Sequence, residues 1–116
     1  MDVLVEVEAL IPDEAPHVQD ATVYVRVQDV TEADAPAKTI KQSVVLGLDL
    51  SLERVVHATV RLPDGMLDPR CDYSVQVHVD TTGTGQLSPG DCLSTQSHPV
   101  RADSPHAWIE VPLTVI

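Results

Sequence analysis

The sequence predicts an all-β fold: a single antiparallel β-sandwich of seven to eight strands, Ig-like or similar Greek-key in type, with residues 1–116 as one domain. Three valine triplets, each on every second residue, are the main observation behind this prediction. They are Val3/Val5/Val7, Val23/Val25/Val27 and Val75/Val77/Val79. A period of two places successive side chains on opposite faces of a strand, so each triplet forms one apolar face with polar residues behind it.

Composition supports the same fold class. The chain contains no Phe, one Trp and two Tyr, so a core must be built from Val, Leu, Ile and Ala. Thin β-branched side chains fill a flat layer between two sheets better than a groove between helices. Nine Pro and five Gly are spread along the chain and supply the turns that many short strands need. A length of 116 residues is enough for one hydrophobic core.

Turn residues divide the chain into seven expected strands, at 2–10, 20–30, 38–48, 53–62, 72–80, 91–100 and 107–115. Proline-containing turns follow the first two strands, and Pro63-Asp64-Gly65 follows the fourth. Residues 81–91 contain Gly83, Gly85 and Gly90 and are expected to form the longest flexible loop. Only residues 31–37 leave room for a short helical turn.

Parity assigns the faces of the remaining strands. In the fourth and last strands the alternate apolar residues point inward: Val56, Ala58, Val60, Leu62, Ala107, Ile109, Val111, Leu113 and Val115. Pro112 cannot donate a ladder hydrogen bond, so the last strand is expected at a sheet edge or at a bulge. The third strand breaks alternation at Val44-Val45, which predicts a bulge there.

Tyr73 follows a proline-containing corner, Asp68-Pro69, and leads into the alternating valines. This is the layout of a tyrosine corner, in which the ring caps the core and the hydroxyl bonds to upstream backbone. Tyr73 shares the inward parity of Val75, as such a corner requires. We therefore interpret Tyr73 as structural.

The net charge is −11, with only two lysines, Lys38 and Lys41. Such a field repels phosphate backbones and anionic lipid headgroups, so nucleic acid is not an expected partner. An acidic surface suits a basic protein patch or divalent cations, although a solvated surface or adaptation to high salt gives the same composition. No apolar run reaches 18 residues, so no membrane-spanning helix is expected.

No motif for catalysis, cofactor binding or metal binding stands out, so the sequence predicts a protein that is not an enzyme. In a hairpin of the fifth and sixth strands, Cys71 and Cys92 fall about 30 Å apart, which argues against a disulfide. His57 and His78 are expected to face outward as exposed strand residues. A two-histidine metal site completed by Asp80 is the less favoured alternative.

Several segments resemble those of the YbaY-like, YscW-type lipoproteins of bacteria. Residues 29–37 (Asp-Val-Thr-Glu-Ala-Asp-Ala-Pro-Ala) with Ile40 resemble that family's "DVS-x-ADAPA-x-x-I" segment. Leu67-Asp68-Pro69 and Tyr73-Ser74-Val75 resemble its "IDP…YSV" segments, and His98-Pro99-Val100 resembles its "YPV" segment. The segments occur in the same order, and the resemblance runs from about residue 3 to residue 115.

This resemblance implies a small β-sandwich, anchored to a bacterial membrane by an N-terminal lipid. Some members of the family act as pilotin-type chaperones that escort a secretin to the outer membrane, and no catalytic residues come with it. In this sequence Met1-Asp2-Val3 leads straight into the first strand, with no lipid-attachment Cys. The chain is therefore expected either in the cytoplasm, which two free thiols favour, or as the trimmed part of an exported periplasmic or cell-envelope protein.

Trp108 is the main candidate for binding a partner, because parity places it on the outer face of the expected edge strand. The equal alternative is that its ring folds over the rim of the sheet or under a loop. Tyr24 also faces outward by parity. The sequence therefore favours a non-enzymatic protein-binding or chaperone-like module with an unidentified protein partner and no cofactor. The alternative is an adhesion or carbohydrate-binding module, which needs several coplanar exposed aromatic residues. Partner identity and oligomeric state do not follow from the sequence.

Overall fold

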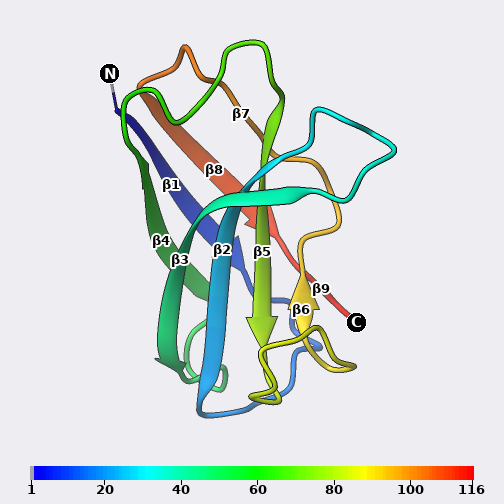
Figure 1. The fold of residues 1–116 in the computed structure, drawn as a ribbon. Coiled ribbons are helices and arrows are strands. Elements are labelled where there is room, and N and C mark those ends of the chain that lie inside the picture. Colours follow the sequence, from blue (N-terminus) through cyan, green and yellow to red (C-terminus); the bar gives the residue numbers. More distant parts are fainter. Residues whose placement is uncertain (1) are drawn as a thin grey trace.

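A computed structural model describes residues 2–116, which fold into two stacked β-sheets with loops gathered at both ends (Figure 1). Nine strands form within this part of the chain, compared with the seven to eight expected. They are β1 (Val3–Leu10), β2 (Ala21–Asp29), β3 (Lys38–Leu48), β4 (Val55–Leu62), β5 (Tyr73–Asp80), β6 (Cys92–Leu93), β7 (Pro99–Val100), β8 (His106–Pro112) and β9 (Thr114–Val115). The all-β prediction is confirmed.

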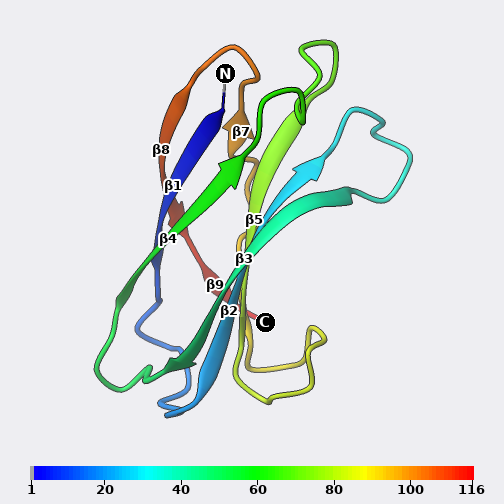
Figure 2. The same ribbon diagram turned by 60° about the vertical axis from the view of Figure 1, so that its left-hand side comes forward.

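The two sheets contain three and six strands and lie as separate layers when seen from the side (Figure 2). The smaller sheet has the order β4-β1-β8, and the larger has the order β3-β2-β5-β6-β9, with β7 also paired to β5. Most pairs are antiparallel, but β1 and β8 run parallel, so the smaller sheet is mixed. The expectation of a purely antiparallel structure is therefore wrong at this pair. The Ig-like connection type stays a prediction.

The valine triplets lie between the two sheets. All nine of these valines are at most 3% exposed, and Val25 of β2 lies directly opposite Val77 of β5. In β4 the alternation is complete, with Val56, Ala58, Val60 and Leu62 buried. Parity therefore predicted the inward faces correctly. The apolar layer between the sheets supplies the main stabilising free energy of the fold.

The expected strand at 91–100 divides into β6 and β7, because serine side chains replace part of the backbone ladder. The hydroxyl of Ser94 accepts a hydrogen bond from the backbone N–H of Val77 at 2.9 Å. Ser74 on β5 accepts one from the backbone N–H of His98 at 3.0 Å. The backbone of Ser94 and of His98 still bonds to β5, through Val77 and Val75, and regular pairing is interrupted between these two residues.

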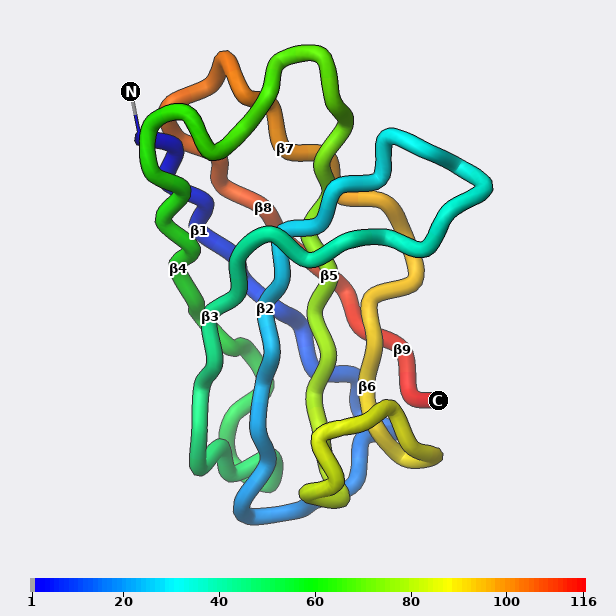
Figure 3. Tube along the Cα trace, viewed as in Figure 1, coloured from blue at the N-terminus to red at the C-terminus, as the bar shows by residue number. Residues whose placement is uncertain are grey.

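The last strand changes sheets. Up to Pro112 it is β8, the edge of the smaller sheet, and from Thr114 it is β9, which pairs with β6 at the edge of the larger sheet (Figure 3). Leu113 lies between the two segments, is buried, and donates its backbone N–H to Leu10 at 3.1 Å. The edge position expected from Pro112 is confirmed, and the chain at this point connects the two layers.

The bulge in β3 lies elsewhere than expected. Val44 and Val45 pair regularly with Tyr24 and Val23, so the prediction of a bulge at Val44-Val45 is wrong. The register instead shifts between Val45 and Leu48, where Gly47 has a φ of 67°. A glycine adopts this left-handed conformation without the Cβ clash that other residues suffer, so the irregularity forms there. A second shift occurs near Ile40.

Tyr73 forms the expected tyrosine corner. Its side chain is buried, and its hydroxyl accepts a hydrogen bond from the backbone N–H of Asp68 at 2.8 Å. Cys71 lies just before this strand, whereas Cys92 pairs with Val79 near the other end. About 20 Å of β5 separates the two ends, so both cysteines are free thiols.

Residues 33–35 form a turn in which the backbone N–H of Ala35 donates to Glu32 at 3.3 Å, and no helix forms at 31–37. Within residues 2–116, no helix is long and apolar enough to cross a membrane.

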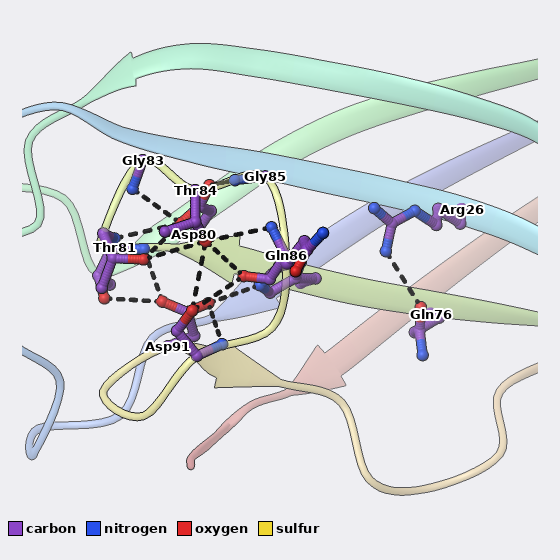
Figure 4. A network of polar contacts seen from close by, with 12 residues as sticks. Arg26, Gln76, Asp80, Thr81, Gly83, Thr84, Gly85, Gln86 and Asp91 are labelled. Carbon is purple, nitrogen blue, oxygen red and sulfur yellow. Dashed lines mark hydrogen bonds and ion pairs between the residues drawn. The ribbon is translucent and has the colours of Figure 1, made fainter.

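Two buried aspartates hold the segment from Asp80 to Asp91, here called the Asp80–Asp91 loop (Figure 4). Asp80 accepts hydrogen bonds from the backbone N–H groups of Thr82, Gly83 and Gly85, at 3.1, 3.0 and 2.8 Å. Asp91 accepts one from the backbone N–H of Thr81 at 2.9 Å. The glycines of this segment predicted a flexible stretch, but the loop is anchored at both of its ends.

Candidate protein-binding face

The outer face of the smaller sheet carries Trp108 and is here called the Trp108 face. Its side chains alternate with the buried ones on β1, β4 and β8. The face comprises Leu4, Glu6, Glu8, Leu10, Val55, His57, Thr59, Arg61, His106, Trp108, Glu110 and Pro112. The side chains on β4 and β8 are exposed and those on the central strand β1 are half-buried, so this face is open to solvent.

Trp108 extends across the central strand. Glu6 on β1 lies between Thr59 on β4 and Trp108 on β8. The indole ring nevertheless meets the ring of His57 on β4 edge to face, with centroids 5.2 Å apart at an interplanar angle of 81°. Its other neighbour is His106, at 6.5 Å between centroids. These contacts hold the indole in place while 58% of the residue stays exposed.

Carboxylates surround the rings of His57, Trp108 and His106. Glu6 pairs with His106 through Nε2, and Glu8 lies between His57 and Glu110 in the register. The one arginine on this face, Arg61, is engaged with Asp2 at 2.6 Å. That contact and the backbone N–H of Asp64 lower the pKa of Asp2. The Trp108 face therefore combines an exposed indole with acidic side chains in a chain of net charge −11.

Tyr24 lies on the other sheet. It is half-buried on the outer face of the larger sheet, where its ring stacks on His78 with centroids 5.7 Å apart. The guanidinium of Arg26 lies 4.9 Å from the same ring. The two aromatic residues singled out by parity, Trp108 and Tyr24, therefore do not form one surface.

The histidine alternative is wrong. His57 lies on β4 and His78 on β5, in different sheets and on their outer faces, so they share no site. His78 is also buried at 3% exposure, because Asp91 and the ring of Tyr24 contact it. Parity cannot reveal this burial, since it depends on a loop that folds over the sheet. In the part of the chain described, no three His, Cys, Asp or Glu side chains gather in a metal-ligand arrangement.

A hollow of about 420 Å³ lies between the tyrosine corner and residues 97–103. Its lining includes Val30, Cys71, Tyr73, Val100 and Asp103, and no histidine. Arg101 lowers the pKa of Asp103 by hydrogen bonding to it, which keeps that carboxylate ionised.

Sequence reasoning missed one exposed apolar group. Four large apolar side chains come together in the sequence around the β3–β4 connection and are 44–79% exposed. They are Val44, Leu46, Leu52 and Val55. The irregular register of β3 explains the omission of Val44 and Leu46, because a strict alternation cannot assign both faces of a bulged strand.

The fold of this protein is similar to that of a protein of known structure. No protein-family model matches the chain, and no curated protein matches it. A solved structure with the same fold is that of an alternative pilotin from the type II secretion system of Vibrio cholerae. The two chains superpose with a TM-score of 0.69 at 16% sequence identity, over 98% of each chain. The protein therefore has a pilotin-like fold, and membership of the YbaY-like family stays a prediction.

Proposed function

We propose that this protein is a non-enzymatic, pilotin-type protein-binding module that holds a basic segment of a partner protein on the Trp108 face. The observation that carries the proposal is Trp108, which is 58% exposed on an edge strand and fixed between His57 and His106. Exposed, pre-positioned Trp side chains are typical anchors of protein interfaces. The full-length likeness to a pilotin supports a chaperone-like role.

The chemistry of this face favours a partner segment with basic and apolar residues. A Lys or Arg side chain is attracted by the face of an indole ring and by neighbouring carboxylates. Glu8 and Glu110 lie close to Trp108 in the register, and the net charge of −11 attracts a basic segment over a longer range. Acidic segments are repelled by the same charges.

The motifs quoted above lead us to propose further that the chain is a divergent bacterial member of the YbaY-like family, with an Ig-like sandwich. The carbohydrate-binding alternative needs coplanar aromatic residues. Trp108 and Tyr24 lie on the outer faces of different sheets, so their arrangement gives that alternative no support.

Affinity capture from a bacterial cell-envelope extract tests the proposal with three forms of the protein: wild type, Trp108→Ala and Leu46→Ala. Leu46 is 76% exposed on the larger sheet and serves as a matched apolar control. We expect a basic partner to be recovered by wild type and Leu46→Ala and lost with Trp108→Ala. Recovery is also expected to fall with added salt, because salt screens exposed charges.

Trp108 is the one tryptophan in the chain, so its fluorescence reports directly on this face. Titration with a peptide copied from the captured partner is expected to shift the emission, and a version with Glu in place of its basic residues is not. Unchanged capture by Trp108→Ala, or an unshifted emission on binding, overturns the assignment of the Trp108 face.

A further inference from the structure

β3 is the outermost strand of the larger sheet, and one of its two edges has no partner strand in the described part of the chain (Figure 1). A long unpaired edge presents a row of backbone N–H and C=O groups that another strand can bind. The strand has 11 residues, and residues 42–45 lie between its two register shifts and carry no charge. This stretch is therefore a regular, uncharged edge.

The hydrogen bonds of the sheet show which backbone groups of β3 are unpaired. On β5, Val77 donates its N–H to the hydroxyl of Ser94 at 2.9 Å and accepts the N–H of Ser94 at 3.0 Å, so its backbone points away from β2. Alternate residues of an antiparallel strand bond to opposite neighbours. Val25, which lies opposite Val77, therefore bonds to Ser43 of β3. The N–H and C=O of the next residue, Val44, point to the open side.

Apolar side chains accompany these free backbone groups. Val44 is 44% exposed and Leu46 is 76% exposed, and both belong to β3. Exposed apolar side chains beside an unpaired edge are a liability in a monomer and a stabilising contact once a second strand is added.

We propose that two copies of this chain associate through their β3 edges, in an antiparallel pair centred on Val44. In this register Val44 faces Val44 of the second copy across a two-fold axis, and Gln42 faces Leu46 of the second copy. The contact uses both β3 edges at once. It leaves the two-residue β9 at each outer margin of the joined sheet, so assembly stops at a dimer.

Local charges favour a second copy in this register. Lys41, one of two lysines in a chain of net charge −11, is exposed and lies opposite Gly47 of the second copy. A Cβ on Gly47 is 4.0 Å from Oδ1 of exposed Asp20, so the ammonium group of Lys41 meets a carboxylate there. Within one chain Lys41 and Gly47 are about 20 Å apart along β3, so this ion pair forms only between copies.

Sedimentation equilibrium of the full chain at about 0.15 M NaCl, where net charge is screened beyond about 8 Å, tests the proposal. Interfaces of this small size are weak, and we expect a reversible dimer with a Kd below about 1 mM. Val44→Glu places two carboxylates face to face at the axis and should weaken the dimer at least about tenfold. Leu87→Glu is the matched control. Leu87 is 51% exposed in the Asp80–Asp91 loop, on the other side of β2, so this variant should dimerise as wild type does.

Charge exchange tests the register. Lys41→Glu and Asp20→Lys should each weaken the dimer, and the two changes together should restore it.

Cysteine cross-linking tests the register independently of affinity. In a Cys71→Ser background, oxidation with diamide should join two copies of Val44→Cys, because facing Cα atoms lie about 5.5 Å apart. Leu46→Cys is the control and should stay unlinked, since its two copies lie more than about 12 Å apart.

A chain that stays monomeric at about 1 mM overturns the proposal. A dimer that Val44→Glu leaves at wild-type strength also overturns it. Loss of the dimer in Trp108→Ala does so as well, since association then uses the Trp108 face.

Discussion

His78 and Asp91 are hydrogen-bonded inside the protein, with 2.8 Å between Nε2 and Oδ2 and with side chains only 3% and 0% exposed. Burial by itself raises the pKa of Asp91, but the hydrogen bonds from His78, Thr81 and Ser88 outweigh it, and the pKa is lowered. The pKa of Asp80 is lowered for the same reason. Burial raises it, but hydrogen bonds from backbone N–H groups, that of Gly85 foremost, outweigh this effect. Both carboxylates are therefore ionised at neutral pH.

The two aspartates make the fold sensitive to acid. A carboxyl group whose pKa is lower in the folded state than the unfolded value of 3.8 stabilises the fold above that value, and this contribution is lost as the pH falls through the folded pKa. We expect the free energy of unfolding, measured by urea denaturation, to be steady near pH 6 and to fall below about pH 4.

Two controls assign this acid dependence to the loop. Asp80→Asn should be less stable than wild type at pH 6 but show a shallower loss on acidification. Added salt should leave most of the wild-type dependence in place, because exposed Asp2 and Asp103 are screened and the buried pair is not. Stability that rises on acidification contradicts the assignment.

Removing the hydroxyl of Tyr73 should destabilise the protein. Tyr73→Phe leaves the backbone N–H of Asp68 without its acceptor, which we expect to lower the free energy of unfolding by about 1–2 kcal/mol. Tyr24→Phe is the control, because the contacts of Tyr24 involve its ring, and a change within about 0.5 kcal/mol is expected. Equal losses in the two variants, measured by urea denaturation, would argue against the tyrosine corner.

The two thiols should react at very different rates. Burial, with a further contribution from Asp91, raises the pKa of Cys92 to about 11, and its side chain is fully buried, whereas Cys71 is half-buried. The thiolate is the reactive form. Labelling with a thiol reagent should modify one cysteine in the native protein and two in denaturant. Cys71→Ser should abolish the native reaction, and persistent labelling of that variant would show that Cys92 is accessible.

The cost of replacing Gly47 should depend on how readily the new residue adopts the local backbone conformation and not on the size of its side chain. A Cβ at this position meets only Oδ1 of Asp20, at 4.0 Å, so no clash arises. The φ of 67° is costly for a β-branched residue, and we expect Gly47→Val to lower the free energy of unfolding by about 1–2 kcal/mol. Gly47→Asn should lose less, because Asn adopts this conformation more readily. Equal losses of unfolding free energy in the two variants would show that packing, and not backbone conformation, determines the cost.

Local sequence patterns predicted those features of the fold that depend on a single strand. Alternating valines define a buried face wherever the opposite face is polar, so the inward residues of β1, β2, β4 and β5 followed from parity. The exposure of Trp108 followed in the same way, because the outward side chains of β8 stay exposed in the part of the chain described. The corner at Tyr73 followed from a short motif whose partner, Asp68, is five residues away.

Features that depend on distant segments did not follow. The parallel pairing of β1 with β8 joins parts of the chain about a hundred residues apart, and nothing in either strand specifies its neighbour. His78 has outward parity, yet Asp91 covers it. The division of the sixth strand depends on hydroxyls of Ser74 and Ser94 that accept bonds which a backbone carbonyl would otherwise take. These outcomes are set by tertiary contacts.

The parallel pairing of β1 and β8 also has a mechanical consequence. The first strand enters at one end of the molecule and the chain leaves, after β9, toward the other (Figure 1). Once the short pairing of β9 with β6 is released, a force that pulls the two termini apart loads the hydrogen bonds between β1 and β8 in shear, so all of them must stretch together. An antiparallel hairpin at the termini would unzip one bond after another under the same tension. The topology thus gives this small domain a rigid clamp along the line joining its ends.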